Sequence, residues 1–243
     1  MDFSGLMQFS FNLEFFSSLF SILIIDIVLS GDNAVVIALA VRSLPRAQRQ
    51  RSIIIGSGAA VLLRITLTAF AVKLLVFPYI KVIGGVLIAW IAIKLFLSDT
   101  DKHEEDKQAE GFFQALRIIL LADFVMSLDN VLAVAAASKG SLFLLLFGLA
   151  LSIPLVVGTS TFLLKLMDRF PIIITLGAAV LGKVAGEMII TDPFIVNTFA
   201  PSKAFSYATE AFFVIAVIVT GKLMVRRKIS KEERALALET GKQ

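Results

Sequence analysis

The chain has 243 residues, of which 58% are hydrophobic and 17% are charged, with a formal net charge of +4. Soluble domains are usually about 45–50% apolar and about 25% charged, so this composition excludes an ordinary soluble domain and indicates a polytopic membrane protein. The mean hydropathy of +0.89 points the same way. Cysteine is absent and histidine occurs once, which excludes disulfides, thiolate metal sites and multi-histidine sites.

Seven segments are long and apolar enough to cross a membrane, which takes about 20 residues per helix. We expect spans at about 13–41, 52–77, 79–97, 113–138, 141–167, 171–190 and 206–225. The predicted fold class is therefore all-α, a single transmembrane transporter domain of about seven helices. A polar linker at 98–112 separates a first repeat at about 13–97 from a second at about 113–190. The seventh helix and a tail at 226–243 follow.

Basic residues are distributed unequally between the two sets of loops. They follow the odd-numbered spans, at Arg42, Arg46, Arg49, Arg51, Lys102, Lys107, Lys165, Arg169, Arg226, Arg227, Lys228, Lys231 and Arg234. The loops of the opposite side carry only Lys81, Lys139 and Lys203. Because cytoplasmic loops are enriched in Lys and Arg, we expect the N-terminus outside and the tail in the cytoplasm. The same distribution favours the cell membrane over nucleic acid as the partner of these charges.

A polar motif occurs twice in these apolar surroundings. The first span contains DIVLSGDNAVVIALA, starting at Asp26, and the fourth contains DFVMSLDNVLAVAAA, starting at Asp123. Asp, Val, Ser, Asp and Asn recur at identical spacing, as D-x-V-x-S-x-D-N. An odd number of membrane crossings separates the copies, so they run in opposite directions. The pattern predicts an inverted repeat of two three-helix halves with a binding site near the midplane.

The chemistry of the motif favours a divalent cation. One Asp at the middle of a membrane helix costs about 2.5–3.5 kcal/mol, so four unpaired ones would cost on the order of 10 kcal/mol. They require cations, protons or basic partners. Carboxylate, amide and hydroxyl oxygens suit Mg²⁺, Ca²⁺ and Mn²⁺ better than Zn²⁺ or Cu⁺. The predicted metal ligands are Asp26, Asp32, Asn33, Asp123, Asp129 and Asn130, supported by Ser30, Ser127, Arg64, Lys183 and Glu187.

Two points of geometry stay open at this stage. Asp26 and Asn33 share a helix face, whereas Asp32 points well away from them on a regular helix. Asp32 therefore either faces a neighbouring helix, or the helix breaks near Gly31.

The intramembrane basic residues also have two interpretations. Arg64 either forms a structural ion pair with a motif Asp or acts as a gate and stand-in cation. Lys183 and Glu187 either form a local pair four residues apart, or Glu187 joins the metal site or carries a proton.

At these residues the chain resembles a known family. The paired D-x5-D-N motifs, Asp26/Asp32/Asn33 and Asp123/Asp129/Asn130, within seven spans are similar to those of the TerC family of integral membrane proteins. That family is named for tellurite resistance, is grouped with lysine-exporter-like proteins, and has bacterial members implicated in manganese efflux. The resemblance implies that the six motif residues bind Mn²⁺ or control its passage.

The leading hypothesis is an exporter of divalent cations, foremost Mn²⁺ as the transported substrate, with proton antiport as a conjectured coupling. No organic cofactor and no enzymatic activity are expected, and a homo-oligomer is left open. The alternative is an exporter of small organic cations or amino acids, as the superfamily link allows. An intramembrane aspartyl protease is a third hypothesis, but Leu29-Ser30-Gly31-Asp32 lacks the first glycine of the G-x-G-D signature.

Overall fold

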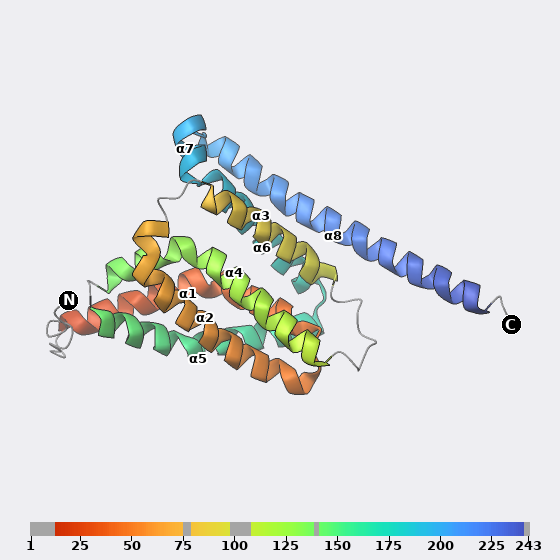
Figure 1. Ribbon diagram of the computed structural model, residues 1–243, viewed down its shortest axis with the longest axis horizontal. Helices are drawn as coiled ribbons and strands as arrows, with labels where there is room; N and C mark the ends of the chain where they lie inside the picture. Colours follow the sequence, from red (N-terminus) through yellow and green to blue (C-terminus); the bar gives the residue numbers. More distant parts are fainter. Residues whose placement is uncertain (1–12, 75–78, 98–107, 139–140, 241–243) are drawn as a thin grey trace.

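The computed structural model describes residues 13–74, 79–97, 108–138 and 141–240. Within these ranges, the side chains of some residues, including 25–30 and 129, are outside the description. All regular structure in the described ranges is helical (Figure 1). The helices are α1 (Leu13–Arg42), α2 (Arg46–Leu74), α3 (Ile80–Leu97), α4 (Gln108–Ala137), α5 (Leu142–Arg169), α6 (Ile172–Ile190), α7 (Pro193–Phe199) and α8 (Lys203–Thr240).

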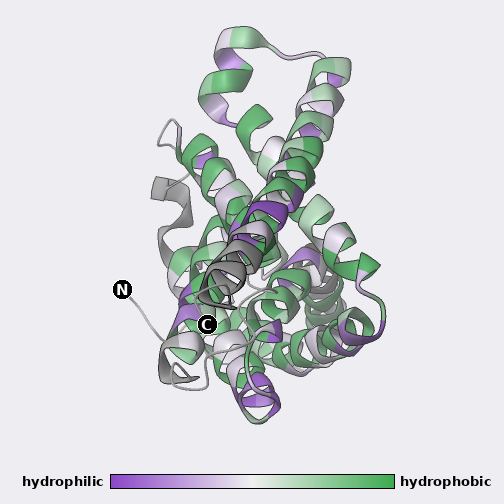
Figure 2. Ribbon diagram, turned by 90° about the vertical axis from the view of Figure 1, so that its right-hand side faces the viewer, coloured by the Kyte–Doolittle hydropathy of each residue, from purple (hydrophilic) through white to green (hydrophobic). Residues whose placement is uncertain are grey.

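The predicted fold class, an all-helical polytopic membrane protein, is confirmed. Six helices of the described chain, α2 to α6 and α8, are long and apolar enough to cross a membrane. A shorter apolar stretch, Phe15–Ile24, lies in α1. Figure 2 shows that hydrophobic residues dominate the helices, and many large apolar side chains face outward. Outward apolar side chains are expected where a helix contacts lipid.

The structure corrects several of the predicted boundaries. The linker predicted at 98–112 is helical from Gln108 onward, and residues 98–107 lie outside the described residues. The last predicted span ends at 225, whereas α8 continues to Thr240 through most of the predicted tail. Lys, Arg, Glu, Ala and Leu dominate that extension and are strong helix formers, so the helix does not end where the hydrophobicity does. The short helix α7 was not predicted.

The helices form two layers, visible in Figure 1. One layer, here called the four-helix body, consists of α1, α2, α4 and α5. The other, here called the three-helix layer, consists of α3, α6 and α8. The pairing is symmetric between the halves of the chain: α1 packs on α5 as α2 packs on α4, and α3 packs on α6. In Figure 1, α1 and α4, which carry the two motifs, run in opposite directions.

One end of the four-helix body is closed by an arginine. Arg49, near the start of α2, donates hydrogen bonds to the carbonyls of Leu44 and Arg42 at the end of α1. Its Nη1 also lies 2.8 Å from Oδ2 of Asp168, near the end of α5. The turn from α1 to α2, the turn from α5 to α6 and the end of α8 all lie at this side (Figure 1), which we call the basic end.

The three-helix layer is held together through glycines. A Cβ added at Gly85 of α3 would lie 2.6 Å from the carbonyl oxygen of Ala185 in α6. One added at Gly182 or Gly186 of α6 would lie 2.8 or 2.7 Å from a Cα of α8, that of Val214 or Glu210. Small residues let membrane helices approach until their backbones touch. These contacts fix α6 between α3 and α8.

The opposite end of this layer is organised by Asp192, which is fully buried. Its carboxylate accepts hydrogen bonds from the backbone N–H of Phe194, at the start of α7, and of Lys81, at the start of α3. The amides of Tyr79 and Val82 lie at 3.3 and 3.4 Å. The first N–H groups of a helix lack partners within the helix, and an acidic side chain supplies one. A single residue therefore caps two helices.

Candidate functional site

The first motif lies in an unbroken helix. α1 is continuous from Leu13 to Arg42, so Gly31 marks no break and the alternative that Asp32 faces a neighbouring helix holds. Asp32 is partly buried and lies within electrostatic range of Lys183 and Glu187 on α6. Asn33 is buried, with 4% of its surface exposed, in the four-helix body. The side chains of Asp32 and Asn33 thus lie in different surroundings.

The second motif places a carboxylate beside a buried arginine. Asp123 of α4 accepts a hydrogen bond from Nη2 of Arg64 on α2, with Oδ1 at 2.6 Å. Their side chains are only 6% and 4% exposed. Nε of Arg64 donates to Oγ of Ser127, at 3.2 Å, and that hydroxyl lies 3.4 Å from the other carboxylate oxygen of Asp123. The ion pair between Arg64 and a motif Asp, one of the two interpretations above, is present.

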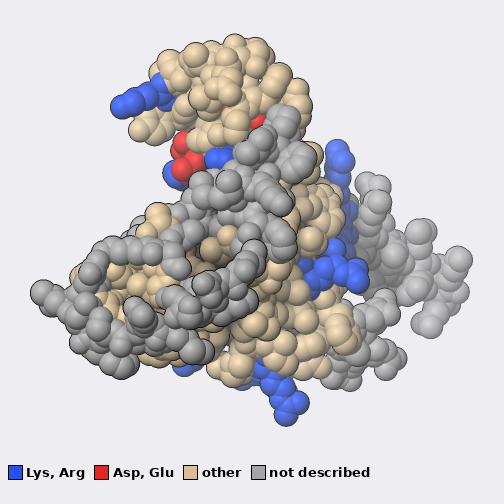
Figure 3. Space-filling view, turned by 60° about the vertical axis from the view of Figure 1, so that its left-hand side comes forward, with Lys and Arg blue, Asp and Glu red and all other residues tan. Residues whose placement is uncertain are grey.

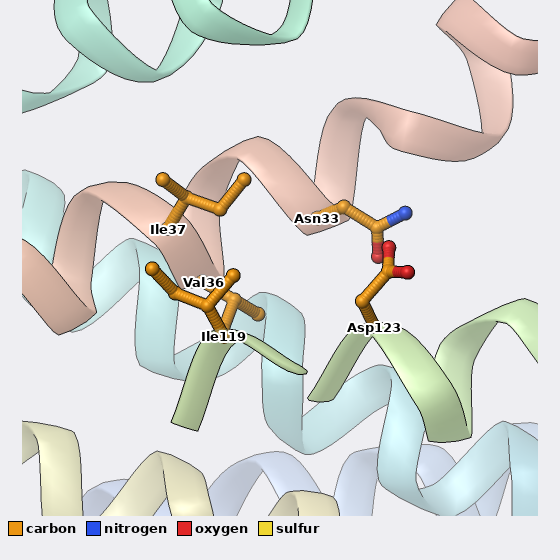
Figure 4. A pocket seen from close by; sticks show the side chains of 5 residues that line it. All are labelled: Asn33, Val36, Ile37, Ile119 and Asp123. Carbon is orange, nitrogen blue, oxygen red and sulfur yellow. The ribbon is translucent and has the colours of Figure 1, made fainter. Parts of the chain in front are cut away.

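Asn33 and Asp123 meet at a small cavity. The cavity is lined by Asn33, Val36, Ile37, Ile119 and Asp123 and measures about 10 Å³. In Figure 4 the amide of Asn33 and the carboxylate of Asp123 point toward one another across it. Neither Oδ1 nor Nδ2 of Asn33 has a hydrogen-bond partner among the described residues. Buried amides are normally paired, so this one indicates a water molecule or an ion between the two motifs.

The arrangement combines hard oxygen donors with a resident positive charge. The amide of Asn33, the carboxylate of Asp123 and the hydroxyl of Ser127 are the donor types that Mg²⁺, Ca²⁺ and Mn²⁺ prefer. The guanidinium of Arg64 already neutralises Asp123 in this conformation. A divalent cation bound at Asp123 would therefore have to share the carboxylate with Arg64 or displace it.

A second group of charges lies at the junction with the three-helix layer. Nζ of Lys183 is 3.0 Å from Oε2 of Glu187 and 3.9 Å from Oε2 of Glu210 on α8. The pair four residues apart is thus present, and both of its side chains are about half exposed. Figure 3 shows acidic and basic side chains side by side below the upper part of this face, and further basic side chains toward its right-hand and lower edges.

The sequence did not predict that Glu210 belongs to this group of charges. Glu210 reaches it because Gly186 brings the backbone of α8 into contact with α6. The signal was present in the sequence as Gly182-x-x-x-Gly186, a spacing that favours close helix packing. The spacing does not say which helix approaches, so only the structure identified the partner.

The structure describes the side chains of only some of the remaining predicted ligands. The side chains of Asp26, Ser30 and Asp129 lie outside the described residues. Asn130 is partly buried in α4. Among the described side chains, no three Asp, Glu or His residues converge in a way that would hold a metal ion. The six-residue cage of the two motifs therefore stays a prediction, of which the structure describes the Asn33–Asp123 part.

Comparison with known proteins gives the family. The model described as "Integral membrane protein TerC family" matches residues 11–230, nearly the whole chain. The chain belongs to the TerC family. It is 39% identical over 210 residues to the uncharacterized membrane protein YjbE of Bacillus subtilis strain 168, covering 84% of this chain and 95% of that protein.

Two more distant relatives match most of the chain as well. The membrane protein YceF of Bacillus subtilis strain 168 is 27% identical over 225 residues, covering 88% of this chain and 82% of that protein. The inner membrane protein YgdQ of Escherichia coli K12 is 25% identical over 211 residues, covering 80% of this chain and 86% of YgdQ. No solved structure matches the chain.

Proposed function

We propose that this TerC family protein is a transporter that exports divalent metal cations, foremost Mn²⁺, across the cell membrane. In the proposed orientation the N-terminus is outside and the basic end faces the cytoplasm. The observation that carries the proposal is the cavity between the two motifs, where the unpaired amide of Asn33 faces the carboxylate of Asp123. The substrate would bind there, with Asp26, Asp32, Asp129 and Asn130 contributing as α1 and α4 rearrange.

Electrostatics supports a role for Arg64 in this cycle. A buried carboxylate without a partner is strongly unfavourable in a membrane helix, so the empty site needs a positive charge. Arg64 supplies it at 2.6 Å from Asp123. An entering divalent cation replaces that charge and releases the guanidinium, which links occupancy of the site to a movement of α2 against α4. Rocking of oppositely inserted halves is the usual means of alternating access.

The size of the site favours an inorganic cation over an organic one. A cavity of about 10 Å³ is near the lower limit for a single water molecule. Val36, Ile37 and Ile119 complete its wall. An amino acid or organic cation would need a much larger pocket and an anchor for its polar groups.

Transport of Mn²⁺ into inverted membrane vesicles tests the proposal. We expect uptake with the wild-type chain and its loss with Asp123→Asn, which keeps the shape of the side chain but removes the charge. Asp168→Asn is the matched control, because it also removes a carboxylate paired with an arginine, but at the basic end. Imposing a proton gradient on the same vesicles tests proton antiport. Uptake that is equal in wild-type, Asp123→Asn and protein-free vesicles would reject the proposal.

A further inference from the structure

Three buried serines in the four-helix body have hydroxyls without a partner. Ser52 and Ser57 belong to α2 and Ser160 belongs to α5. They are 0%, 2% and 0% exposed. No group in the described part of the chain forms a hydrogen bond with any of the three hydroxyls. Buried polar groups in proteins are nearly always paired, with protein or with ordered water.

Other hydroxyls on the helices of this chain behave differently. Several donate to a backbone carbonyl of the preceding turn, as Thr68 does to Arg64 and Thr161 does to Val157, both at 2.7 Å. Ser152, equally buried in α5, bonds to the carbonyl of Leu149 at 2.8 Å. That local bond is the usual way for a serine or threonine to satisfy itself inside a helix. This local bond is absent at Ser52, Ser57 and Ser160, so the partners of their hydroxyls lie elsewhere.

The three hydroxyls lie at two depths in the half of the four-helix body at the basic end. Thr161, next to Ser160, has its Oγ1 3.5 Å from Oε1 of Gln50, so Ser160 lies level with the first turns of α2, at about the depth of Ser52. Ser57 is seven residues before Arg64 on the same helix face, about 10 Å away along the axis. The series thus leads from the basic end toward the Arg64–Asp123 ion pair.

The series ends at the other unpaired group of the body. The amide of Asn33 faces the cavity with Asp123 and also lacks a partner among the described residues. Asn33, Ser52, Ser57 and Ser160 all belong to α1, α2 and α5. In the described part of the three-helix layer, no buried side-chain nitrogen or oxygen is left without a partner. These unpaired groups are therefore concentrated in the four-helix body.

We propose that Ser52, Ser57 and Ser160 line a hydrated passage from the basic end of the four-helix body to the Asn33–Asp123 cavity. The inference rests on the proposed function for its cargo, a partly hydrated divalent cation. Hydroxyls can accept from and donate to the water molecules that such a cation retains. Arg64 closes the inner end. The passage brings the cation to Asp123, which is paired with the guanidinium of Arg64.

Reactivity of introduced cysteines tests the passage, because the chain has no cysteine of its own. Ser57→Cys and Ser160→Cys change one atom each, and a charged, water-soluble methanethiosulfonate reagent would be applied to the full-length protein in inverted vesicles. The controls are Ala92→Cys in α3 and Ala178→Cys in α6, which are 0% and 1% exposed and lie in the apolar core. Both controls lie closer to the end of their helix at the basic end than Ser57 and Ser160 do, so depth alone would favour them.

We expect the two serine positions to react at least about tenfold faster than the controls, because a thiol in apolar surroundings stays protonated and inert. Mn²⁺ added with the reagent should slow the reaction at Ser57→Cys. Rates no higher than those of the alanine controls would overturn the passage, even in a chain that transports Mn²⁺. Fast reaction without any divalent-cation flux in the wild-type chain would overturn the proposed function and leave the passage standing. A circular dichroism spectrum and a thermal unfolding curve like those of the wild type show that each cysteine variant is folded.

Discussion

The four-helix body and the three-helix layer differ in their closest helix contacts. In the body, Gly148 faces the side chain of Ile22 and Gly56 faces that of Ile119. In the layer, Gly182 and Gly186 face the Cα atoms of α8, although Gly84 and Gly221 of the same layer face side chains. Side chains can change rotamer while backbones in contact cannot, so the layer is the more rigid of the two.

The two regions also differ in what they bury. The body encloses the Arg64–Asp123 ion pair, the unpaired amide of Asn33 and the three unpaired serine hydroxyls. In the layer, Lys183 and Glu187 keep about half of their side-chain surface exposed. A polar interior that is incompletely paired costs stability, and such a cost is typical of a functional site. The comparison fits the proposed function, in which the body binds the cation and the layer supports it.

The largest expected effect comes from breaking the ion pair of the body. Asp123→Ala removes the carboxylate that pairs with the buried charge of Arg64, which should lower the free energy of unfolding by about 3–5 kcal/mol. Combining Asp123→Leu with Arg64→Met removes both charges, and a buried pair replaced in this way often loses little stability. Thermal unfolding in detergent, followed by circular dichroism, measures both. A double variant as unstable as Asp123→Ala would show that the pair is not what the body depends on.

A smaller effect is expected from separating α6 and α8 in the layer. In Gly186→Val the new side chain meets the backbone of Glu210, and overpacking of this kind costs about 1–3 kcal/mol. Gly158→Val on α5 is the matched control, because an added Cβ there has no atom within 4 Å. The same melting experiment compares them. Equal melting temperatures would contradict the view that backbone contact makes the layer rigid.

The smallest effect is expected from removing a helix cap, one in each region. Asp192→Ala removes the cap of both α3 and α7, whereas Ser141→Ala removes only the bond to the amide of Leu144 at the start of α5. Loss of an N-cap costs about 0.5–2 kcal/mol, so Asp192→Ala should lie at the upper end and Ser141→Ala near the lower. Asp192→Asn keeps an accepting oxygen and should lose less. A greater loss in Ser141→Ala than in Asp192→Ala would refute the double cap.

Much of the fold follows from hydrophobicity alone. The spans at 79–97, 141–167 and 171–190 agree with α3, α5 and α6 within a few residues, because an apolar run long enough to cross a membrane has few alternatives to a helix. The ends of α8 and α4 were misjudged because helix propensity continues past the apolar residues. Asp192 and α7 were missed because a cap depends on which amides fold back onto it.

The sequence predicted which residues belong to the candidate site, but not how they are arranged in space. Repetition of the motif singled out Asn33 and Asp123 without reference to any fold. That Asn33 faces Asp123 while its neighbour Asp32 lies near Lys183 depends on the rotation of α1 between α4 and α6. Glu210 and the three serines carried no pattern that marked them, since single hydroxyls in apolar helices usually bond to their own backbone.

The sequence by itself determined that the chain lies in a membrane, which segments are helical, and that two like polar motifs run in opposite directions through it. Those properties depend on hydrophobic length and on residue spacing, which are local along the chain. Only the tertiary structure decided which polar groups are paired and which are left open, because hydrogen bonding inside the protein depends on which helices lie side by side. The pairing of Arg64 with Asp123 and the unpaired amide of Asn33 are products of that packing.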